Sequence, residues 1–340
     1  MERVPRRNHQ FDLLRILFAV LVLLSHAPEL TDGNRSREIL SRLTTPHFSF
    51  GMFGVDGFFL LSGFLIVKSW INSPHFGSFI VKRFLRICPG YVAAMLIGIV
   101  FVGLLPSGGL SFIRHGVSVV FGAFPENHYP LLNGSLWTIF YEFECYILVA
   151  LWGMAGLFRS PKLWLMMTAG FLLRWINLGP VWHLRWPDYL DGLLGSPDAL
   201  ARFAAIFFVG GCFFLFRSKI RFVPWLASCC TLVVVAIAIL KPQFAELGVV
   251  TFGSYVLFYI GSLRMQVLSW MAKVPDLSYG IYLYGWPVES LIIWRFHPSP
   301  WIVFFESTVI CFGLAWFSWT FVESPALSLS SPLKTSPLTA

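Results

Sequence analysis

Long apolar stretches recur along the whole chain, and this pattern restricts the possible fold more than any other feature. A helix needs about 17–25 mainly apolar residues to cross the hydrocarbon core of a bilayer. Ten segments reach this length, at residues 11–30, 50–70, 87–105, 131–153, 163–179, 200–216, 222–240, 247–263, 277–294 and 301–321. The shorter apolar segment 110–124 suits a re-entrant or interfacial helix, or an eleventh span.

The composition places these segments in a membrane rather than in a soluble core. Only 12% of the residues are charged, whereas a soluble domain carries about 25%. The sequence therefore predicts an all-α, polytopic membrane helix bundle of about ten spans. We expect residues 1–325 to form one membrane domain, and residues 326–340, rich in Ser, Pro and Thr, to form a flexible cytoplasmic tail. Because no small-residue cleavage site follows the first apolar run, we expect that run to be retained.

The basic residues are distributed unevenly between the two sets of loops. Fifteen Lys and Arg fall in the terminal segments and even-numbered loops, and seven in the opposite loops. The positive-inside rule then predicts both termini in the cytoplasm, and an eleventh span would spoil the alternation. We expect the protein to be located in the bacterial cytoplasmic (inner) membrane. The net charge of +8 is thereby explained by orientation, and no basic run is interleaved with aromatic residues in a polar setting, which argues against nucleic-acid binding.

The first apolar segment carries ionisable residues on one face. Arg15 and His26 are eleven residues apart, which is nearly three helical turns and roughly 16 Å along the axis. Asp12 precedes Arg15 by three residues and lies beside it on that face. Ionisable groups in a membrane helix usually face the bundle interior or a cavity. Arg15 and His26 are therefore candidate functional residues.

Two further segments combine polar residues with small or cyclic ones. The stretch GVDGFFLLSGFLI contains Asp56, which either caps the helix or lines the same cavity as His26, and also Gly63, which allows another helix to approach closely. The stretch KRFLRICPGY holds Lys82, Arg83 and Arg86 before Pro89, and proline can start a helix at its first turn. Arginine suits phosphate binding, but for this cluster taken by itself ordinary positive-inside flanking is the better explanation.

Two segments nearer the C-terminus contribute further candidates. Glu142, in SLWTIFYEFECY, lies within a predicted span, where it serves either an active site or an interhelical salt bridge with Arg15 or Arg174. The stretch SYGIYLYGWPV repeats aromatic residues, including Tyr279, at helical spacing. Such a stripe is more often packing than a ligand site. No Cys-x-x-Cys pair or His cluster has metal-ligand spacing, so we expect no metal.

In this order, these stretches resemble the acyltransferase-3 family of integral membrane acyltransferases. The spacing of Arg15 and His26 matches the family's Arg-x10-His signature, and the C-terminal FVESP is similar to its terminal Glu-x-Pro element. The resemblance covers nearly the whole chain. Many members have a His before Trp-Pro in the penultimate helix motif, but this chain has Gly285 there, which excludes a second catalytic His at that position.

The resemblance implies transfer of an acyl group, usually acetyl from acetyl-CoA, to a hydroxyl of a glycan, a lipid-linked sugar or a similar acceptor. His26 would be the general base, because an imidazole titrates near neutral pH. Asp56 or Glu142 would orient it, and Arg15 would hold the donor or stabilise negative charge. The donor-binding residues implied are Lys82, Arg83, Arg86, Ser62 and Tyr279. The alternative is a non-catalytic transporter or flippase of a lipid-linked glycan or acylated compound, and use of an acyl-CoA distinguishes the two.

Overall fold

The computed structural model describes residues 9–103, 123–124, 126–176, 195–263, 270–271 and 274–329. Within these ranges the chain is helical and contains no strand. The helices of eight or more residues are α1 (His9–Asp32), α3 (Phe50–Asn72), α4 (Phe76–Gly103), α7 (Trp137–Met154), α8 (Pro161–Trp175), α10 (Pro197–Leu215), α11 (Pro224–Leu240), α13 (Ser254–Ser262), α14 (Ser278–Phe296) and α15 (Pro300–Ser318). The short elements are α2 (Ile39–Leu43), η1 (Leu157–Arg159), η2 (Pro242–Phe244), α12 (Ala245–Gly248), η3 (Val249–Gly253), η5 (Trp319–Glu323) and α16 (Ser324–Ser328).

Each predicted apolar window contains a helix, so the helical bundle is confirmed. By length and apolarity, six helical stretches in the described ranges are able to cross a membrane: His9–Asp32, Phe50–Asn72, Phe76–Val100, Pro197–Leu215, Pro242–Ser262 and Pro300–Ser328. The helices α7, α8, α11 and α14 are shorter or less apolar. Ten spans and cytoplasmic termini therefore stay predictions. Most of segment 110–124 lies outside the described residues.

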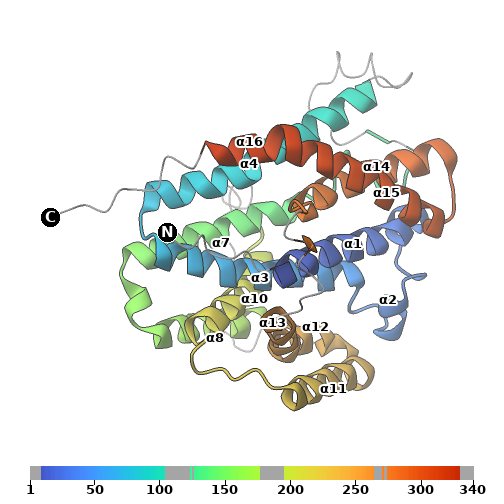
Figure 1. Cartoon of the computed structure of the whole chain (residues 1–340). Coiled ribbons are helices and arrows are strands. Elements are labelled where there is room, and N and C mark those ends of the chain that lie inside the picture. The colour runs from blue at the N-terminus through green and yellow to red at the C-terminus, as the bar shows by residue number, and fades with distance from the viewer. Residues whose placement is uncertain are drawn as a thin grey trace.

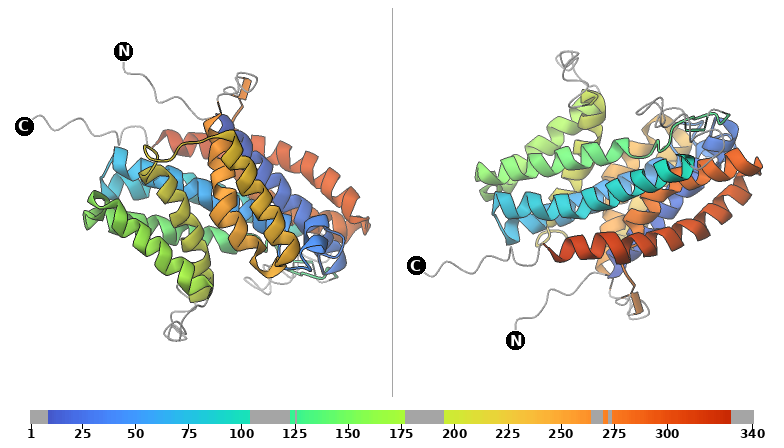
Figure 2. Two further views of the ribbon diagram at one scale, coloured as in Figure 1. Left: turned by 90° about the horizontal axis from the view of Figure 1, so that it is seen from below. Right: turned by 90° about the horizontal axis from the view of Figure 1, so that it is seen from above.

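The helices form a bundle with α1 and α3 at its centre (Figure 1). Helix α1 packs against α3, α14 and α15, and α3 packs against α10 on its other side. In Figure 1, α4, α14, α15 and α16 lie above this pair, and α11, α12 and α13 lie below it. The two views of Figure 2 show that α4, α7 and α15 run roughly alongside one another. This arrangement leaves α1 facing helices from both ends of the chain.

Helix α4 differs most from its prediction. It begins at Phe76, eleven residues before the predicted start, so Lys82, Arg83 and Arg86 are helical and Pro89 lies inside the helix. The expectation that Pro89 starts this helix is therefore wrong. The sequence alone marks the three cations as the edge of a span, but carboxylates elsewhere in the chain neutralise part of this charge and allow the helix to continue. At the C-terminus, the tail predicted from residue 326 includes the end of α16, and Leu327 borders a cavity.

Glycines bring α3 and α10 into close contact, as the small residues of the α3 sequence predict. A Cβ atom added at Gly63 would lie 1.8 Å from the Phe207 carbonyl oxygen, and one added at Gly210 would lie 2.0 Å from the Leu60 carbonyl oxygen. Neither distance is possible for real atoms. The two backbones therefore touch directly. This contact fixes the position of α3 along the axis of α10.

Replacing Gly63 with Ala should lower the thermal midpoint of the protein in detergent. The added methyl group has to push two backbones apart, and overpacking of this kind costs about 1–3 kcal/mol. Gly170 in α8 is the matched control, because its added Cβ would meet nothing within 4 Å. There the change to Ala should stabilise by about 0.5–1 kcal/mol. Equal shifts for the two variants would contradict the close-contact interpretation.

Glu38 joins the C-terminal half of α1 to the start of α3. Its side chain is buried, and one oxygen accepts a hydrogen bond from Ser25 Oγ at 2.9 Å. The other oxygen accepts the backbone N–H of Phe50, at the first residue of α3. Burial raises the pKa of Glu38 above its ordinary value. The connection therefore holds Ser25, and with it the neighbouring His26, in place.

The raised pKa of Glu38 predicts a pH-dependent stability. The protonated Glu38 side chain stabilises the fold. This contribution is fully present below the ordinary carboxyl pKa, about 4, and is lost as the pH rises through the raised pKa of the folded protein. Glu38→Gln keeps polar partners for Ser25 and Phe50 without the charge. The thermal midpoint of the wild type should therefore fall relative to this variant as the pH rises above about 4. Glu126→Gln, at an exposed carboxylate, is the control; identical pH profiles for Glu38→Gln and wild type would refute the prediction.

Candidate functional site

A cavity of about 280 Å³ lies between α1, α3, α4, α7 and α14. We call it the basic cavity, because four cations line it and one acid, Glu142, faces them. Seven of the nine residues predicted for the site meet here: Arg15, Ser62, Lys82, Arg83, Arg86, Glu142 and Tyr279. The structure therefore places these seven residues around one cavity, and the roles assigned to them stay predictions.

Arg15 and Arg86 share one carboxylate. Asp276 Oδ2 accepts hydrogen bonds from Arg15 Nη1 at 2.7 Å and from Arg86 Nη2 at 2.5 Å. Arg86 Nη1 also lies 3.8 Å from Glu323 Oε2, and its guanidinium is 5.8 Å from the ring centroid of Tyr279. The sequence analysis assigned no role to Asp276, although an acid directly before the predicted span 277–294 was a visible signal. These contacts tie α1, α4 and the start of α14 together.

Arg83 differs from Arg86 although it lies one turn away on the same helix. No carboxylate in the described ranges lies within 4.0 Å of its guanidinium, as the ion pairs there involve other cations. Its Nε is buried without a hydrogen-bond partner, and the guanidinium lies 5.9 Å from the ring centroid of Phe79. The sequence assigned Arg83 and Arg86 the same role. The structure separates them into a cation available to a ligand and a cation already paired.

Glu142 takes part in a hydrogen-bond network of its own. Its Oε1 accepts from Ser62 Oγ at 2.7 Å and from the Tyr146 hydroxyl at 2.6 Å. Of the two alternatives for Glu142, the structure does not show the salt bridge with Arg15 or Arg174, because Arg15 pairs with Asp276 and Arg174 pairs with Asp198. Glu142 lines the basic cavity, and His26 lines a different one.

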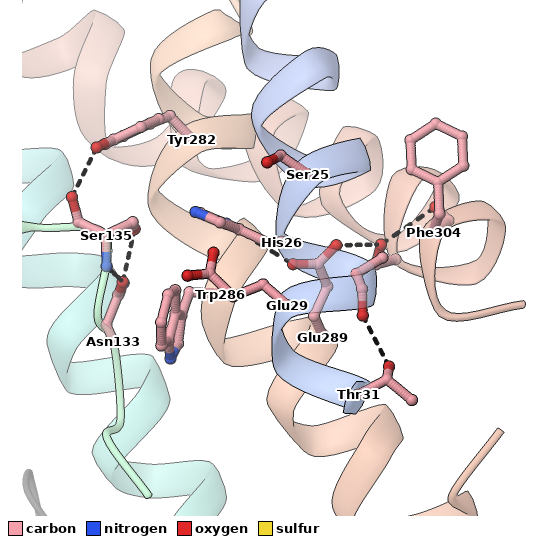
Figure 3. A network of polar contacts seen from close by, with 12 residues as sticks. Ser25, His26, Glu29, Thr31, Asn133, Ser135, Tyr282, Trp286, Glu289 and Phe304 are labelled. Atoms are coloured by element: carbon pink, nitrogen blue, oxygen red, sulfur yellow. Dashed lines mark hydrogen bonds and ion pairs between the residues drawn. The ribbon is translucent and has the colours of Figure 1, made fainter. Parts of the chain in front are cut away.

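His26 faces a second cavity of about 290 Å³, which we call the histidine cavity. Its other side chains include two tryptophans and several charged groups: Glu29, Arg35, Trp137, Arg202 and Trp286. The His26 ring packs edge-to-face on Trp286 with 5.1 Å between ring centroids. Figure 3 shows the ring extending from α1 between Glu289 and the residues Ser135 and Tyr282.

The acid beside His26 is Glu289 of α14. Its Oε2 lies 3.8 Å from His26 Nδ1, and its Oε1 accepts from Ser307 Oγ at 3.3 Å. The Glu289 side chain is 0% exposed. Neither the His26 Nδ1 nor this Oε2 has a hydrogen-bond partner. In active sites such contacts are often long before the substrate binds and then tighten. The sequence analysis missed Glu289, although an acid inside a predicted span was the signal that drew attention to Glu142.

Asp56 does not orient His26, contrary to the prediction. It is fully buried, and its Oδ1 accepts from Arg202 Nη2 of α10 at 2.8 Å. Arg202 also contacts Glu246 of α12. Asp56 therefore holds α3 to α10 and fixes Arg202, which in turn lines the histidine cavity.

Comparison with known proteins decides the class of this site. The profile of the acyltransferase-3 family, described as an acyltransferase domain, matches residues 8–321. The chain belongs to this family. It is therefore an enzyme, a membrane acyltransferase.

Two relatives of this acyltransferase align with it over almost their whole lengths. Nodulation protein 10 of Rhizobium leguminosarum bv. viciae is 29% identical over 376 positions, which cover 98% of this chain and 96% of that protein. An O-acetyl transferase of Shigella phage Sf6 is 27% identical over 350 positions, which cover 96% of this chain and 98% of that protein. No solved structure shows a significant match.

The structure also explains why this acyltransferase has Gly285 where many members of the family have a His. A Cβ atom added there would lie 2.8 Å from Leu23 Cδ1 of α1. Helices α14 and α1 therefore pack too closely for an imidazole at this position. The lining of the histidine cavity therefore includes His26 without a second His at residue 285.

The unequal pairing of the two α4 arginines predicts unequal losses of stability. Arg86→Gln leaves Glu323 without its cation and Asp276 with only one, and breaking a buried ion pair costs about 3–5 kcal/mol. Arg83→Gln removes a cation that has no carboxylate partner, so the thermal midpoint should stay unchanged or rise slightly. Thermal unfolding of both variants in one detergent tests this. Equal losses would show that Arg83 is as firmly paired as Arg86.

Proposed function

We propose that this acyltransferase moves an acyl group, acetyl foremost, from acyl-CoA in the basic cavity to a hydroxyl of a carbohydrate in the histidine cavity. The observation that carries this proposal is the adjacency of a cationic cavity, in which Glu142 is already hydrogen-bonded, and a second cavity that contains His26 beside Glu289. The name of the phage relative, an O-acetyl transferase, supports the reaction class.

The basic cavity suits the phosphate groups of a CoA thioester. Arg83 and Lys82 lie on one helix and line it, and no carboxylate in the described ranges forms an ion pair with either. Arginine offers several donors in a fixed geometry to phosphate oxygens. Arg15 and Arg86 add positive charge while Asp276 holds them in position. The donor would enter from the cytoplasm, where the positive-inside rule places this end of α4.

His26 supplies the proton transfer. Its Nε2 accepts the proton of the acceptor hydroxyl as the oxygen attacks the carbonyl carbon of the thioester. The carbon–sulfur bond then breaks, and the imidazolium returns the proton to the CoA sulfur. Glu289 lies on the Nδ1 side of the ring, where a carboxylate stabilises the imidazolium and fixes the tautomer with Nε2 free.

The histidine cavity has the lining that a sugar acceptor needs. Trp137 and Trp286 offer apolar ring surfaces, and Arg202 offers hydrogen-bond donors. Arg35 Nη2 is held by Glu29 Oε2 at 2.8 Å. A few polar groups in a mainly apolar wall fix the orientation of a ligand. We propose a glycan or lipid-linked sugar as acceptor, and the bacterial inner membrane as the location.

Labelled acetyl-CoA tests the chemistry with the purified protein in nanodiscs, where water serves as acceptor. Wild type should bind the donor and cleave it slowly. His26→Ala should bind with unchanged affinity and lose cleavage by at least about 100-fold, as is typical of a removed general base. Glu289→Gln should bind normally and cleave at an intermediate rate. A His26→Ala variant that cleaves at the wild-type rate would remove His26 from the mechanism.

The same experiment tests the phosphate site. Arg83→Gln should weaken donor binding by about tenfold or more, because a charge-assisted hydrogen bond contributes about 1.5–3 kcal/mol. Arg159→Gln, at an exposed arginine, is the matched control and should bind as wild type does. If folded wild type neither binds nor cleaves the donor, acetyl-CoA is not the substrate. That result would favour the alternative function, a non-catalytic transporter.

A further inference from the structure

The two cavities share part of their lining. Three residues border both of them: Val55 of α3, Thr138 of α7 and Tyr282 of α14. Each comes from a different helix, and together they lie between the two cavities. We call these three residues the neck.

Hydrogen bonds restrain two of the three neck side chains, Thr138 and Tyr282. The Tyr282 hydroxyl donates to the Ser135 carbonyl oxygen at 2.6 Å. Its single proton is used there, so the Thr138 hydroxyl is the donor in the 2.5 Å contact between Thr138 and Tyr282. Both side chains are buried, and Phe58 packs edge-on against the Tyr282 ring at 6.1 Å. Figure 3 shows Tyr282 bonded to Ser135 on the side of His26 away from Glu289.

The neck lies between the proposed donor site and the base. Arg83 lines only the basic cavity, and His26 lines only the histidine cavity. A donor whose phosphates rest on Arg83 must therefore advance its acyl end into or through the neck to reach an acceptor beside His26. The acyl group is the leading end of the molecule, so its size decides whether the thioester carbon arrives.

We propose that Val55, Thr138 and Tyr282 set the largest acyl group that the enzyme transfers, and that this limit is near acetyl. The inference rests on the proposed function. Val55 and the Thr138 methyl group present apolar bulk, and the bonded hydroxyls restrain Tyr282 from turning aside. Each added methylene then meets a packed wall, and a pocket discriminates one methylene by about 10–200-fold.

The test uses acetyl-, propionyl-, butyryl- and succinyl-CoA with the full-length protein in nanodiscs. The measured quantity is the release of CoA thiol with water as acceptor: the water oxygen bonds to the acyl carbon, the carbon–sulfur bond breaks and the sulfur takes the proton. Wild type should cleave acetyl-CoA fastest. Val55→Ala and Thr138→Ala should each raise the ratio of butyryl to acetyl cleavage by about tenfold or more, and Val55→Ile should lower the ratio of propionyl to acetyl cleavage.

Matched controls separate the neck from general loosening. Val67→Ala alters a fully buried valine three turns further along α3, outside both cavities. Tyr284→Phe removes a hydroxyl from the same helix as Tyr282, also outside both cavities. Neither should change the acyl ratio, even if the absolute rate falls. Tyr282→Phe should raise the ratio, because it releases the restraint and keeps the ring.

The outcomes distinguish this inference from the proposed function. If wild type cleaves acetyl-CoA but the Val55 and Thr138 variants keep its acyl ratios, the neck does not select the acyl group. A wild type that cleaves butyryl-CoA as fast as acetyl-CoA would also overturn the inference. If wild type cleaves none of the four donors, the proposed function itself fails before any neck variant is measured. Binding of CoA alone, unchanged in the neck variants, would confirm that they are folded.

Discussion

The contact on which the site depends is the carboxylate of Asp276 between two guanidinium groups. Arg15 and Arg86 come from α1 and α4, and Asp276 precedes α14. Arginine within an apolar helix is costly unless it is paired, so these ion pairs allow α1 to keep Arg15 and α4 to keep Arg86 inside the bundle. Two of the elements that these pairs join, α1 and α14, contribute residues to both cavities. The third, α4, carries Arg83, so one shared counterion connects the helix of Arg83 with the helix of His26.

The sequence predicted the scaffold well because apolar length is a local property. Each predicted window contains a helix, and most of the predicted polar residues line one cavity. Partners across the bundle are not local. Arg15 and Arg86 are separated from Asp276 by 261 and 190 residues, and nothing in one sequence identifies such pairs. For that reason Asp56 and Glu142 were both possible partners of His26, and the actual neighbour, Glu289, was overlooked within a stripe of aromatic residues.

Three buried or partly buried carboxylates, which are chemically alike, have different partners in the structure. Asp56 forms an ion pair with Arg202, and Glu142 accepts hydrogen bonds from Ser62 and Tyr146. Of the three acids, only Glu289 lies beside the imidazole of His26. Burial makes these assignments exclusive, since a buried charge without a partner costs several kcal/mol. Of these three acids, only Glu289 therefore lies within 4.0 Å of His26.

Arg83 has a thermodynamic consequence for the resting enzyme. Its partly buried guanidinium has no counterion among the described residues, so it carries a solvation penalty that Arg86 escapes. In the proposed reaction, a donor phosphate bound by Arg83 would remove that penalty in addition to forming its own contacts. By linkage, a ligand that binds only the folded state shifts the folding equilibrium toward it. Donor binding at Arg83 would therefore stabilise the fold as well as position the substrate.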